Sequence, residues 1–363
     1  MDKDVVPQPL LDRRTSYDRY LAGEGLPVIE TFNITDLLTV DVGPWPRKGA
    51  RGAIINFFGS ASVNDAYVLD IQPAGHTTVQ RHMYEELIYV ARGRGATTVW
   101  NSAGYRTTFE WKAGSFFAIP LNCSYQHFNG SGTESARYFA VTNAPLMMNL
   151  IHNDDFIFNL NYDFVDRFGS DPARTGDFTG AGIAYAGRVW ETNFVPDVMA
   201  MTLQEWRERG AGSNVMLEVA NSSMCGHISE FPVGTYKKAH RHGPGANVVI
   251  LQGSGYSLLW REGDPFHRID WARGSVVVPP ERWFHQHFNT GPEPARYLAM
   301  RWGSQKYRSI GGEYQVDRSV TVGGDQIEYG DEDPAVRRIF EQELAINGVE
   351  SRMAELAGPA SAT

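Results

Sequence analysis

An internal repeat is the feature of this sequence that most constrains its fold. Segments of the first half recur in the second half 160 residues later, in the same order. Three pairs of segments show this offset: Gly93-Arg94-Gly95 with Gly253-Ser254-Gly255, Trp111-Lys112-Ala113-Gly114-Ser115 with Trp271-Ala272-Arg273-Gly274-Ser275, and Gln126-His127-Phe128-Asn129 with Gln286-His287-Phe288-Asn289. The offset falls to 159 for Ala136-Arg137-Tyr138 and Ala295-Arg296-Tyr297, which places a one-residue deletion in the turn before them. The chain is therefore predicted to be a tandem duplication of one domain.

Each copy has the local pattern of a β domain. Short apolar segments rich in β-branched and aromatic residues follow one another closely, separated by turn residues. In the first copy these segments are 53–58, 66–71, 86–91, 95–100, 105–111 and 115–120. We predict an all-β protein with two tandem barrels or sandwiches. The predicted divisions are an N-terminal arm (1–50), a first domain (51–145), an inter-domain segment (146–200), a second domain (201–330) and a C-terminal helix and tail (331–363).

The segments outside the repeat carry predictions of their own. Residues 147–158 are too apolar for a free linker, so they are predicted to pack across the domain interface. Pro334 and the helically spaced apolar residues after it predict a helix from about 334 to 356. The N-terminal arm contains several prolines, and residues 12–21 are a candidate short helix within it.

Composition excludes several classes of protein. The net charge is −9 and no segment concentrates Lys and Arg, so a nucleic acid is not an expected partner. No apolar run reaches the ~18 residues of a membrane span, and the N-terminus lacks the apolar core of a signal peptide. The two cysteines, Cys123 and Cys225, form neither a CxxC pair nor a disulfide framework. We therefore expect a reduced, cytoplasmic protein, and the exposed barrel faces predict a homo-oligomer.

Three histidines in the second copy have the spacing of a metal site. His240 and His242 are two residues apart, so on an extended strand both side chains point to the same face. His285 follows after a segment marked by Gly and Pro. Neutral imidazoles suit Zn, Cu, Fe or Ni, and a site with open positions suits non-haem Fe(II). We predict a metal centre formed by these three side chains.

Aligning the two copies shows that only the second retains this set. Four pairs of residues occupy equivalent positions: His240 and Gln80, His242 and His82, Ala246 and Glu86, and His285 and Tyr125. The second copy thus offers three histidines and no carboxylate. The first copy is predicted to be a degenerate site that is hydrogen-bonded internally, and weak metal binding through His82 and Glu86 is the alternative.

These residues resemble the cupin superfamily, and the duplication resembles a bicupin. The matching residues are His240-Arg241-His242 with Gly253, followed by Gly274, Pro280, His285 and Asn289. The resemblance covers both β domains and implies two double-stranded β-helix (jelly-roll) barrels. The His-Arg-His sequence followed by Ala246 in place of a glutamate resembles gentisate-type ring-cleaving dioxygenases more closely. In that family the metal usually sits in the first cupin, whereas here it would sit in the second.

This resemblance implies an oxidative function, and two other functions remain as alternatives. The preferred hypothesis is a dioxygenase that holds Fe(II) and uses O2 to cleave a C–C bond of a phenolic, catecholic or dicarbonyl acid. Without a protein carboxylate the site would keep its full positive charge, which favours a bidentate anionic substrate. Oxygen-independent lyase, isomerase or decarboxylase chemistry with Mn, Zn or Ni is the first alternative. The family pattern of oxalate decarboxylases has a Glu in both copies, so the missing carboxylate argues against a close relation to them. A non-catalytic binding or storage bicupin is the second.

Further residues of the second copy are candidates for the site. His287 is a candidate acid or base, but His127 occupies its position in the first copy, which favours a structural role. Arg301 and Trp302 are neighbours on one predicted strand, so only one of them faces the barrel, to bind a carboxylate or to line the pocket. Candidates for contact with the substrate, each with core packing or a structural position as the alternative, are Asn247, Tyr256, Trp260, Trp283 and Trp302. Lys237 and Lys238 are expected to be solvated, and His227 has no partner at ligand spacing and is expected to have no role in the site.

Overall fold

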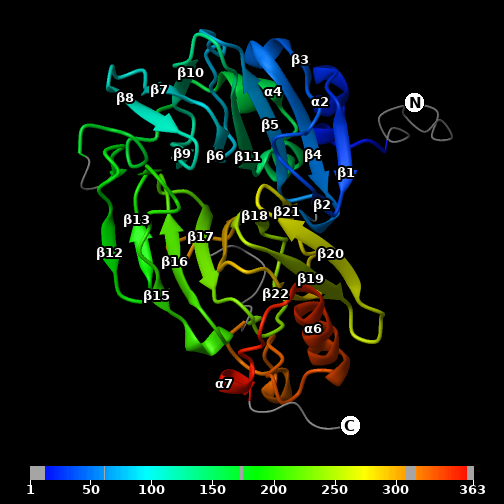
Figure 1. Cartoon of the computed structure of the whole chain (residues 1–363). Helices are drawn as coiled ribbons and strands as arrows, with labels where there is room; N and C mark the ends of the chain where they lie inside the picture. Colours follow the sequence, from blue (N-terminus) through cyan, green and yellow to red (C-terminus); the bar gives the residue numbers. More distant parts are fainter. Residues whose placement is uncertain (1–12, 61, 172–174, 308–315, 358–363) are drawn as a thin grey trace, which may run out of the picture.

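The computed structural model describes residues 13–60, 62–171, 175–307 and 316–357. Two β domains lie one above the other, with the earlier part of the chain in the upper domain and α6 and α7 beside the lower one (Figure 1). Each domain contains a large sheet and a three-stranded sheet that face each other. The predicted all-β fold of two tandem jelly-roll-like domains with a C-terminal helix is confirmed.

The first domain contains the strands that the apolar segments predicted. Its large sheet has the order β1-β4-β5-β11-β6-β9-β14, with β3 beside β4, and its small sheet has the order β10-β7-β8. The bounds are β1 Val28–Thr31, β3 Gly43–Trp45, β4 Ala50–Phe57, β5 Asp65–Ile71, β6 Glu86–Arg92, β7 Arg94–Trp100, β8 Arg106–Lys112, β9 Phe116–Ile119, β10 Ser124–Asn129, β11 Ala136–Thr142 and β14 Phe194–Val195.

The second domain repeats this arrangement. Its large sheet has the order β12-β13-β16-β17-β23-β18-β21-β2, with β15 beside β16, and its small sheet has the order β20-β19-β22. The bounds are β2 Asn33–Ile34, β12 Ile183–Tyr185, β13 Val189–Glu191, β15 Gln204–Glu205, β16 Ser213–Glu218, β17 Met224–Phe231, β18 Asn247–Gln252, β19 Ser254–Trp260, β20 His267–Ala272, β21 Val276–Val277, β22 Phe284–Asn289 and β23 Ala295–Trp302.

Two glycines of the sequence repeat lie at equivalent turns between strands. Gly93 joins β6 to β7 and Gly253 joins β18 to β19, and their φ angles are +90° and +87°. Residues with a side chain rarely adopt this left-handed conformation, so glycine fits the one-residue connection between strands. The same turn therefore sets the register of both barrels.

The two domains exchange short strands. β2, from the N-terminal part of the chain, pairs with β21 of the second domain, while β14, from the segment between the domains, pairs with β9 of the first. One hydrophobic cluster contains residues of both domains, among them Val68, Phe139, Leu217 and Leu298. The facing large sheets thus share a continuous core, and each domain is completed by a strand from elsewhere in the chain.

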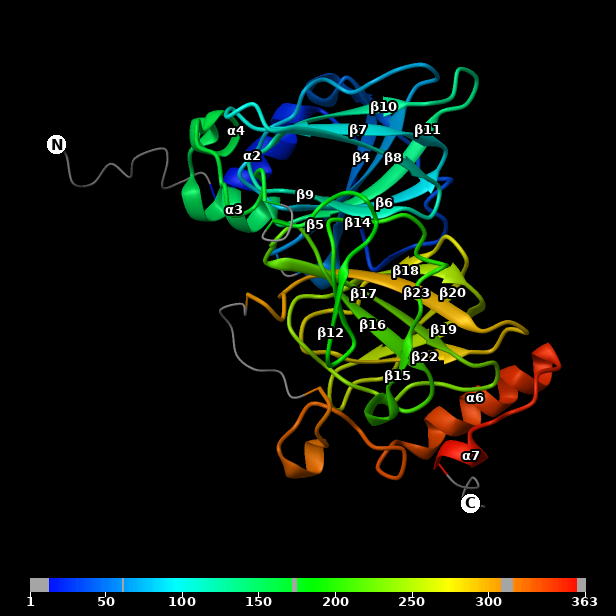
Figure 2. The same ribbon diagram turned by 90° about the vertical axis from the view of Figure 1, so that its left-hand side faces the viewer.

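Helices cover the outer sides of the domains. α2 (Ser16–Glu24), α3 (Ala144–Ile151) and α4 (Asp154–Asn159) lie together beside the first domain (Figure 2). The prediction that residues 147–158 pack across the domain interface is therefore wrong, because α3 and α4 pack on α2 in a separate apolar cluster. None of the helices in the described residues is both long and apolar enough to span a membrane.

The C-terminal helix is shorter than predicted. α6 spans Pro334–Asn347, and α7 is a separate turn at Ala354–Ala357. Gly348 ends α6 with a left-handed φ of +67°. Val336, Phe340 and Leu344 of α6 pack against the outer face of the small sheet of the second domain. Parts of the predicted arm (1–12) and tail (358–363) lie outside the described residues.

Candidate metal centre

The structure brings His240, His242 and His285 together. His285 lies on β22, and His240 forms an isolated antiparallel bridge with it. One nitrogen from each ring can be chosen so that all three lie within 4.8 Å of one another. The ring centroids are 4.1 Å apart for His240 and His285 and 4.8 Å apart for His242 and His285. The side chains converge as the i, i+2 spacing predicted, although residues 241 and 242 are not in a strand.

The outer nitrogen of each ring faces a main-chain carbonyl. Nδ1 of His242 lies 3.1 Å from the oxygen of Gly243, Nδ1 of His240 lies 3.4 Å from that of Lys238, and Nδ1 of His285 lies 3.3 Å from that of Trp283. A carbonyl only accepts, so these contacts assign the proton to Nδ1 and leave the lone pair on Nε2. This orientation and tautomer are those of histidines that bind a metal. The donor set therefore fits a divalent ion.

All three imidazoles are held neutral. Burial lowers the pKa of His242 to about 4, helped by the nearby positive charge of Arg301. Burial also lowers the pKa of His240 and of His285 well below the ordinary value, and Arg209 and the neighbouring histidines add to the effect. Only a neutral imidazole has a lone pair to offer a metal, so the environment favours the form that binds.

Positive side chains predominate around these histidines, and Asp325 contributes an opposing negative charge at His242. Arg301 shares the inward face of β23 with Tyr297 and Ala299, and it forms no ion pair with any described residue. Arg209 is 6% exposed; its Nη1 donates to the carbonyl of Val316 over 2.8 Å, and Asp317 is 3.9 Å away. Burial lowers its pKa to about 10. The interior of the second barrel is therefore strongly electropositive.

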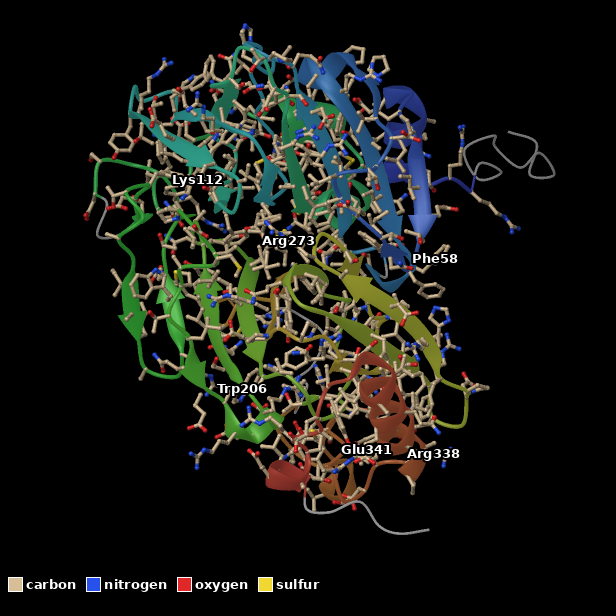
Figure 3. All side chains as sticks on the ribbon, in the orientation of Figure 1. Phe58, Lys112, Trp206, Arg273, Arg338 and Glu341 are labelled. Carbon is tan, nitrogen blue, oxygen red and sulfur yellow. The ribbon has the colours of Figure 1, made fainter. Side chains whose placement is uncertain are left out.

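Lys237 is a third buried cation, and the expectation that it is solvated is wrong. Its side chain is 4% exposed, and its Nζ donates to the Ser229 hydroxyl over 3.2 Å. The ring of Trp206, labelled in Figure 3, lies 5.9 Å from this nitrogen and 5.2 Å from the Arg209 guanidinium carbon. No described carboxylate pairs with Lys237, and burial lowers its pKa to about 7. Lys238, in contrast, pairs with Glu328 at 2.5 Å.

The equivalent position of the first barrel is filled by a closed hydrogen-bonded network. Tyr125 donates to Glu86 over 2.7 Å and lies 2.9 Å from Nε2 of His82. Nδ1 of His82 lies 2.8 Å from the carbonyl of Tyr84, so both ring nitrogens have partners. Burial alone would raise the pKa of Glu86, but Lys48, His82 and Tyr67 hold it well below its ordinary value. Gln80 bonds instead to the carbonyl of Arg47 over 2.9 Å. This arrangement leaves the ring of His82 no nitrogen free for a metal.

Two aromatic candidates lie on the wrong face of the small sheet. The ring of Tyr256 stacks on Phe288 at 4.6 Å, and Trp260 stacks on Phe284 at 5.7 Å. These partners alternate along β22 with His285 and His287, so they point outward, toward α6. The substrate-stacking role of Tyr256 and Trp260 is therefore wrong, and their role is packing beneath the C-terminal helix.

Two further candidates face the other domain. Asn247 alternates along β18 with Ala246 and Val248, which belong to the apolar core of the second barrel, and its amide lies 3.5 Å from the carbonyl of Met300. Trp302 packs against the cluster shared by the two domains. Alternation on β23 thus selects Arg301 as the inward residue. The assignments of Asn247 and Trp302 to the substrate pocket are wrong for this reason. Trp283 contributes its carbonyl to His285.

His287 belongs to a hydrogen-bond chain that both barrels share. Trp271 donates to the Ser257 hydroxyl over 3.0 Å, and that hydroxyl lies 2.7 Å from Nδ1 of His287. In the first barrel Trp111, Thr97 and His127 form the same chain, with distances of 2.9 and 2.7 Å. Because the chain persists where the other histidines are absent, its presence favours the structural role of His287.

Three residues near the site were missed by reasoning from the sequence: Arg209, Lys237 and His227. A signal for Arg209 was present, since Trp206 and Gly210 repeat Trp45 and Gly49 with an offset of 161. Lys237 replaces Thr77 in the aligned copies. His227 alternates on β17 with Ser229 and Phe231, so it faces the barrel interior.

Comparisons with known proteins show the fold and no closer kinship. No protein-family model matches the chain, and no curated protein matches it. A mutant form of Bacillus subtilis oxalate decarboxylase is 12% identical, with 77% of this chain and 79% of that chain covered and a TM-score of 0.50. The formate complex of Lactobacillus farciminis oxalate decarboxylase is 13% identical, with 74% and 85% covered and a TM-score of 0.49. The chain is similar in fold to a bicupin oxalate decarboxylase.

Proposed function

We propose that this chain is a metal-dependent enzyme that binds a divalent ion through His240, His242 and His285 and acts on a small organic acid. One observation carries the proposal. Three neutral imidazoles converge, without a carboxylate ligand, inside a barrel that contains Arg209, Lys237 and Arg301. Such a site keeps a high positive charge, and an anionic substrate would compensate it.

The chain's own residues would bind and orient that substrate. A bound divalent ion would supply Lewis-acid or redox chemistry. Arg301 presents a guanidinium from the inward face of β23, suited to two hydrogen bonds with a carboxylate. His240 and His285 are 9% and 3% exposed, so their burial excludes most water from the inner side of the site. This low-dielectric surrounding strengthens the attraction between the cations and the substrate.

The reaction we favour is oxygen-independent cleavage of a C–C bond beside a carboxylate, as in a decarboxylase or lyase that uses Mn, Zn or Ni. The solved structure with a TM-score of 0.50 is an oxalate decarboxylase, which supports this class by analogy of fold. The buried cations support it independently, because they would stabilise the negative charge that develops when such a bond breaks.

A dioxygenase using Fe(II) is the second candidate, and Ala246 is the observation that favours it. A histidine-only centre leaves more positions for an organic acid and O2 together than a centre that also binds a glutamate. The substrate in that case would be a phenolic, catecholic or dicarbonyl acid. The gentisate-type resemblance of residues 240–246 belongs with this candidate.

Metal analysis followed by turnover with and without oxygen tests these assignments. We expect the purified chain to contain a stoichiometric divalent metal, and His285→Ala to lose it. A panel of short dicarboxylic, 2-oxo and hydroxybenzoic acids would then be tested anaerobically for CO2 release and aerobically for O2 uptake. Anaerobic turnover supports the lyase, whereas turnover coupled to O2 uptake supports the dioxygenase. A chain without affinity for any divalent ion would contradict both.

A further inference from the structure

The first barrel contains a carboxylate, Glu86, at its centre. We call the groups that contact this carboxylate, and the groups at the equivalent positions of the second barrel, the carboxylate cradle. Glu86 accepts hydrogen bonds from the hydroxyls of Tyr125 and Tyr67, and Lys48 Nζ lies 3.6 Å from the same carboxylate. Lys48 also donates to Tyr67 over 2.9 Å. His82 is also close to Glu86, with its Nε2 3.8 Å from the carboxylate. All of these groups are buried.

Strand pairing identifies the residues at the same positions in the second barrel. Tyr67 pairs with Ala140 on β11, and His227 pairs with Ala299 on β23, the equivalent strand. The position of Glu86 is taken by Ala246, which directly precedes β18. The remaining equivalences follow from the sequence repeat: Lys48 with Arg209, Tyr125 with His285, and His82 with His242. The second barrel thus retains a polar or cationic group at every contact position and lacks only the carboxylate.

His227 has a nitrogen that lacks a partner in this cradle. Its Nδ1 is buried, and no described residue hydrogen-bonds to it. Its ring lies 5.8 Å from that of Tyr297, on the inward side of the large sheet. Burial and the positive charge of Arg301 and Lys237 keep the ring neutral by lowering its pKa well below the ordinary value. A buried polar atom without a partner costs free energy comparable to a lost hydrogen bond, so a ligand is the natural partner.

We propose that the carboxylate of the substrate occupies, in the second barrel, the place that the Glu86 carboxylate occupies in the first. Arg209 and His227 bind its oxygens there, as Lys48 and Tyr67 bind those of Glu86. This inference rests on the proposed function, because it places the group beside His242 and His285. It restricts the substrate class to carboxylic acids, since a catechol without a carboxylate would leave His227 Nδ1 without a partner and Arg209 with only the distant Asp317 as a counter-charge.

The test measures binding of acetate to the full-length chain. The probe is 13C-labelled acetate, titrated into protein loaded with Zn and into protein treated with a chelator, with acetamide as the uncharged control. We expect acetate to bind at millimolar or tighter concentration in the zinc-loaded chain, and more weakly but measurably in the chelated chain. Acetamide should bind at least ten-fold more weakly in both.

Two pairs of matched variants assign the binding to the cradle. His227→Phe should weaken acetate binding about ten-fold or more in both metal states, the effect of losing one charge-assisted hydrogen bond. His227→Tyr copies Tyr67 of the first barrel and should retain binding within about three-fold. Ala246→Glu should abolish acetate binding while zinc content is retained, and its melting temperature should exceed that of Ala246→Gln, because only the charged side chain pairs with Arg209.

The outcomes separate this inference from the proposed function. If acetate binds only in the zinc-loaded chain and His227→Phe binds it as tightly as wild type, the metal alone holds the carboxylate and the inference is overturned. If the chain binds no metal but still binds acetate in a manner that His227→Phe weakens, the proposed function fails and the cradle remains. Equal melting temperatures of Ala246→Glu and Ala246→Gln would also contradict the pairing with Arg209.

Discussion

The two barrels share one backbone plan and differ in the charge of their interiors. The first contains Lys48 together with two buried carboxylates, Asp65 and Glu86. Their positions in the second barrel hold Arg209, Cys225 and Ala246. Two threonines of the first barrel, Thr77 and Thr142, are replaced by Lys237 and Arg301. The interior thus changes from one cation with two acids to three cations with none at these positions.

This difference shows how a duplicated fold separates stability from binding. In the first barrel the ion pair of Lys48 and Glu86 and the hydroxyls of Tyr67 and Tyr125 satisfy one another, so the network needs no ligand. In the second barrel Lys237 and Arg301 form no ion pair with a described carboxylate, and Arg209 has only Asp317 at 3.9 Å. This arrangement costs stability unless an anion binds. Departures from the rule that buried charges are paired are expected at functional sites.

The largest expected effect is the conversion of the second site into the first by His285→Tyr. The substitution copies Tyr125 and removes one of three metal ligands, so bound metal should fall from stoichiometric to near zero after dialysis. Elemental analysis checks this. Tyr125→Phe is the matched control and should leave the metal content unchanged. Retention of metal by His285→Tyr would contradict the assignment of the centre to the second barrel.

The next effect concerns the carboxylate of the first barrel. Glu86→Ala leaves Lys48 buried without its partner, and loss of one member of such a pair costs about 3–5 kcal/mol of unfolding free energy. Chemical denaturation would measure it, with the exposed Glu110→Gln as control. Acetate added to Glu86→Ala should restore part of the loss by filling the vacated place. A change below about 1 kcal/mol would show that the network does not stabilise the barrel.

The third prediction concerns Lys237, whose burial lowers its pKa to about 7. Between this value and the ordinary value of 10.5 the unfolded chain binds more protons than the folded chain, so stability rises with pH across that window. Lys237→Met removes the buried charge and keeps an unbranched side chain of similar length. We expect the variant to be more stable than wild type at pH 7, and the difference to shrink as the pH approaches 10.

Denaturation of metal-free protein at several pH values would measure this difference, because metal binding would otherwise add its own pH dependence. Lys238→Met, which removes a cation paired with Glu328, serves as the control and should not stabilise the chain. A constant difference between Lys237→Met and wild type from pH 6 to 10 would contradict the buried titration.

The smallest effect separates the structural and catalytic roles of His287. His287→Phe and His127→Phe each break the chain from the tryptophan through the hydroxyl to the histidine, so each should cost about 1–3 kcal/mol of stability. His287→Phe should retain metal and at least a tenth of the turnover. A complete loss of turnover in a folded, metal-loaded His287→Phe variant would establish the catalytic role instead.

Much of the fold could be predicted from the sequence because the repeat records it twice. The strands between residues 50 and 120 lie within a few residues of their predicted bounds, since alternation and turn glycines are local signals. The end of α6 was missed although Gly348 is a typical terminating residue. The exchange of β2 and β14 between the domains had no signal, because two-residue strands carry no pattern.

The candidate site divides in the same way. The i, i+2 spacing and the aligned copies were sufficient to propose His240, His242 and His285, and also the degenerate set around Glu86. Alternation alone left Arg301 and Trp302 open, and the register of β23 selected Arg301. Tyr256 and Trp260 were misplaced because an aromatic pattern does not reveal which side of a sheet a helix covers.

The sequence by itself determined the duplication, the succession of strand segments along the first copy and which copy keeps three histidines, because each of these follows from the spacing of neighbouring or repeated residues. Only the tertiary structure decided that Arg209, Lys237 and His227 face the same chamber as those histidines. Arg209 precedes β17, His227 lies on it and Lys237 follows it, so these side chains reach one chamber only when the barrel closes. The charge of a barrel interior is a property of that closure, and no single segment of the chain contains it.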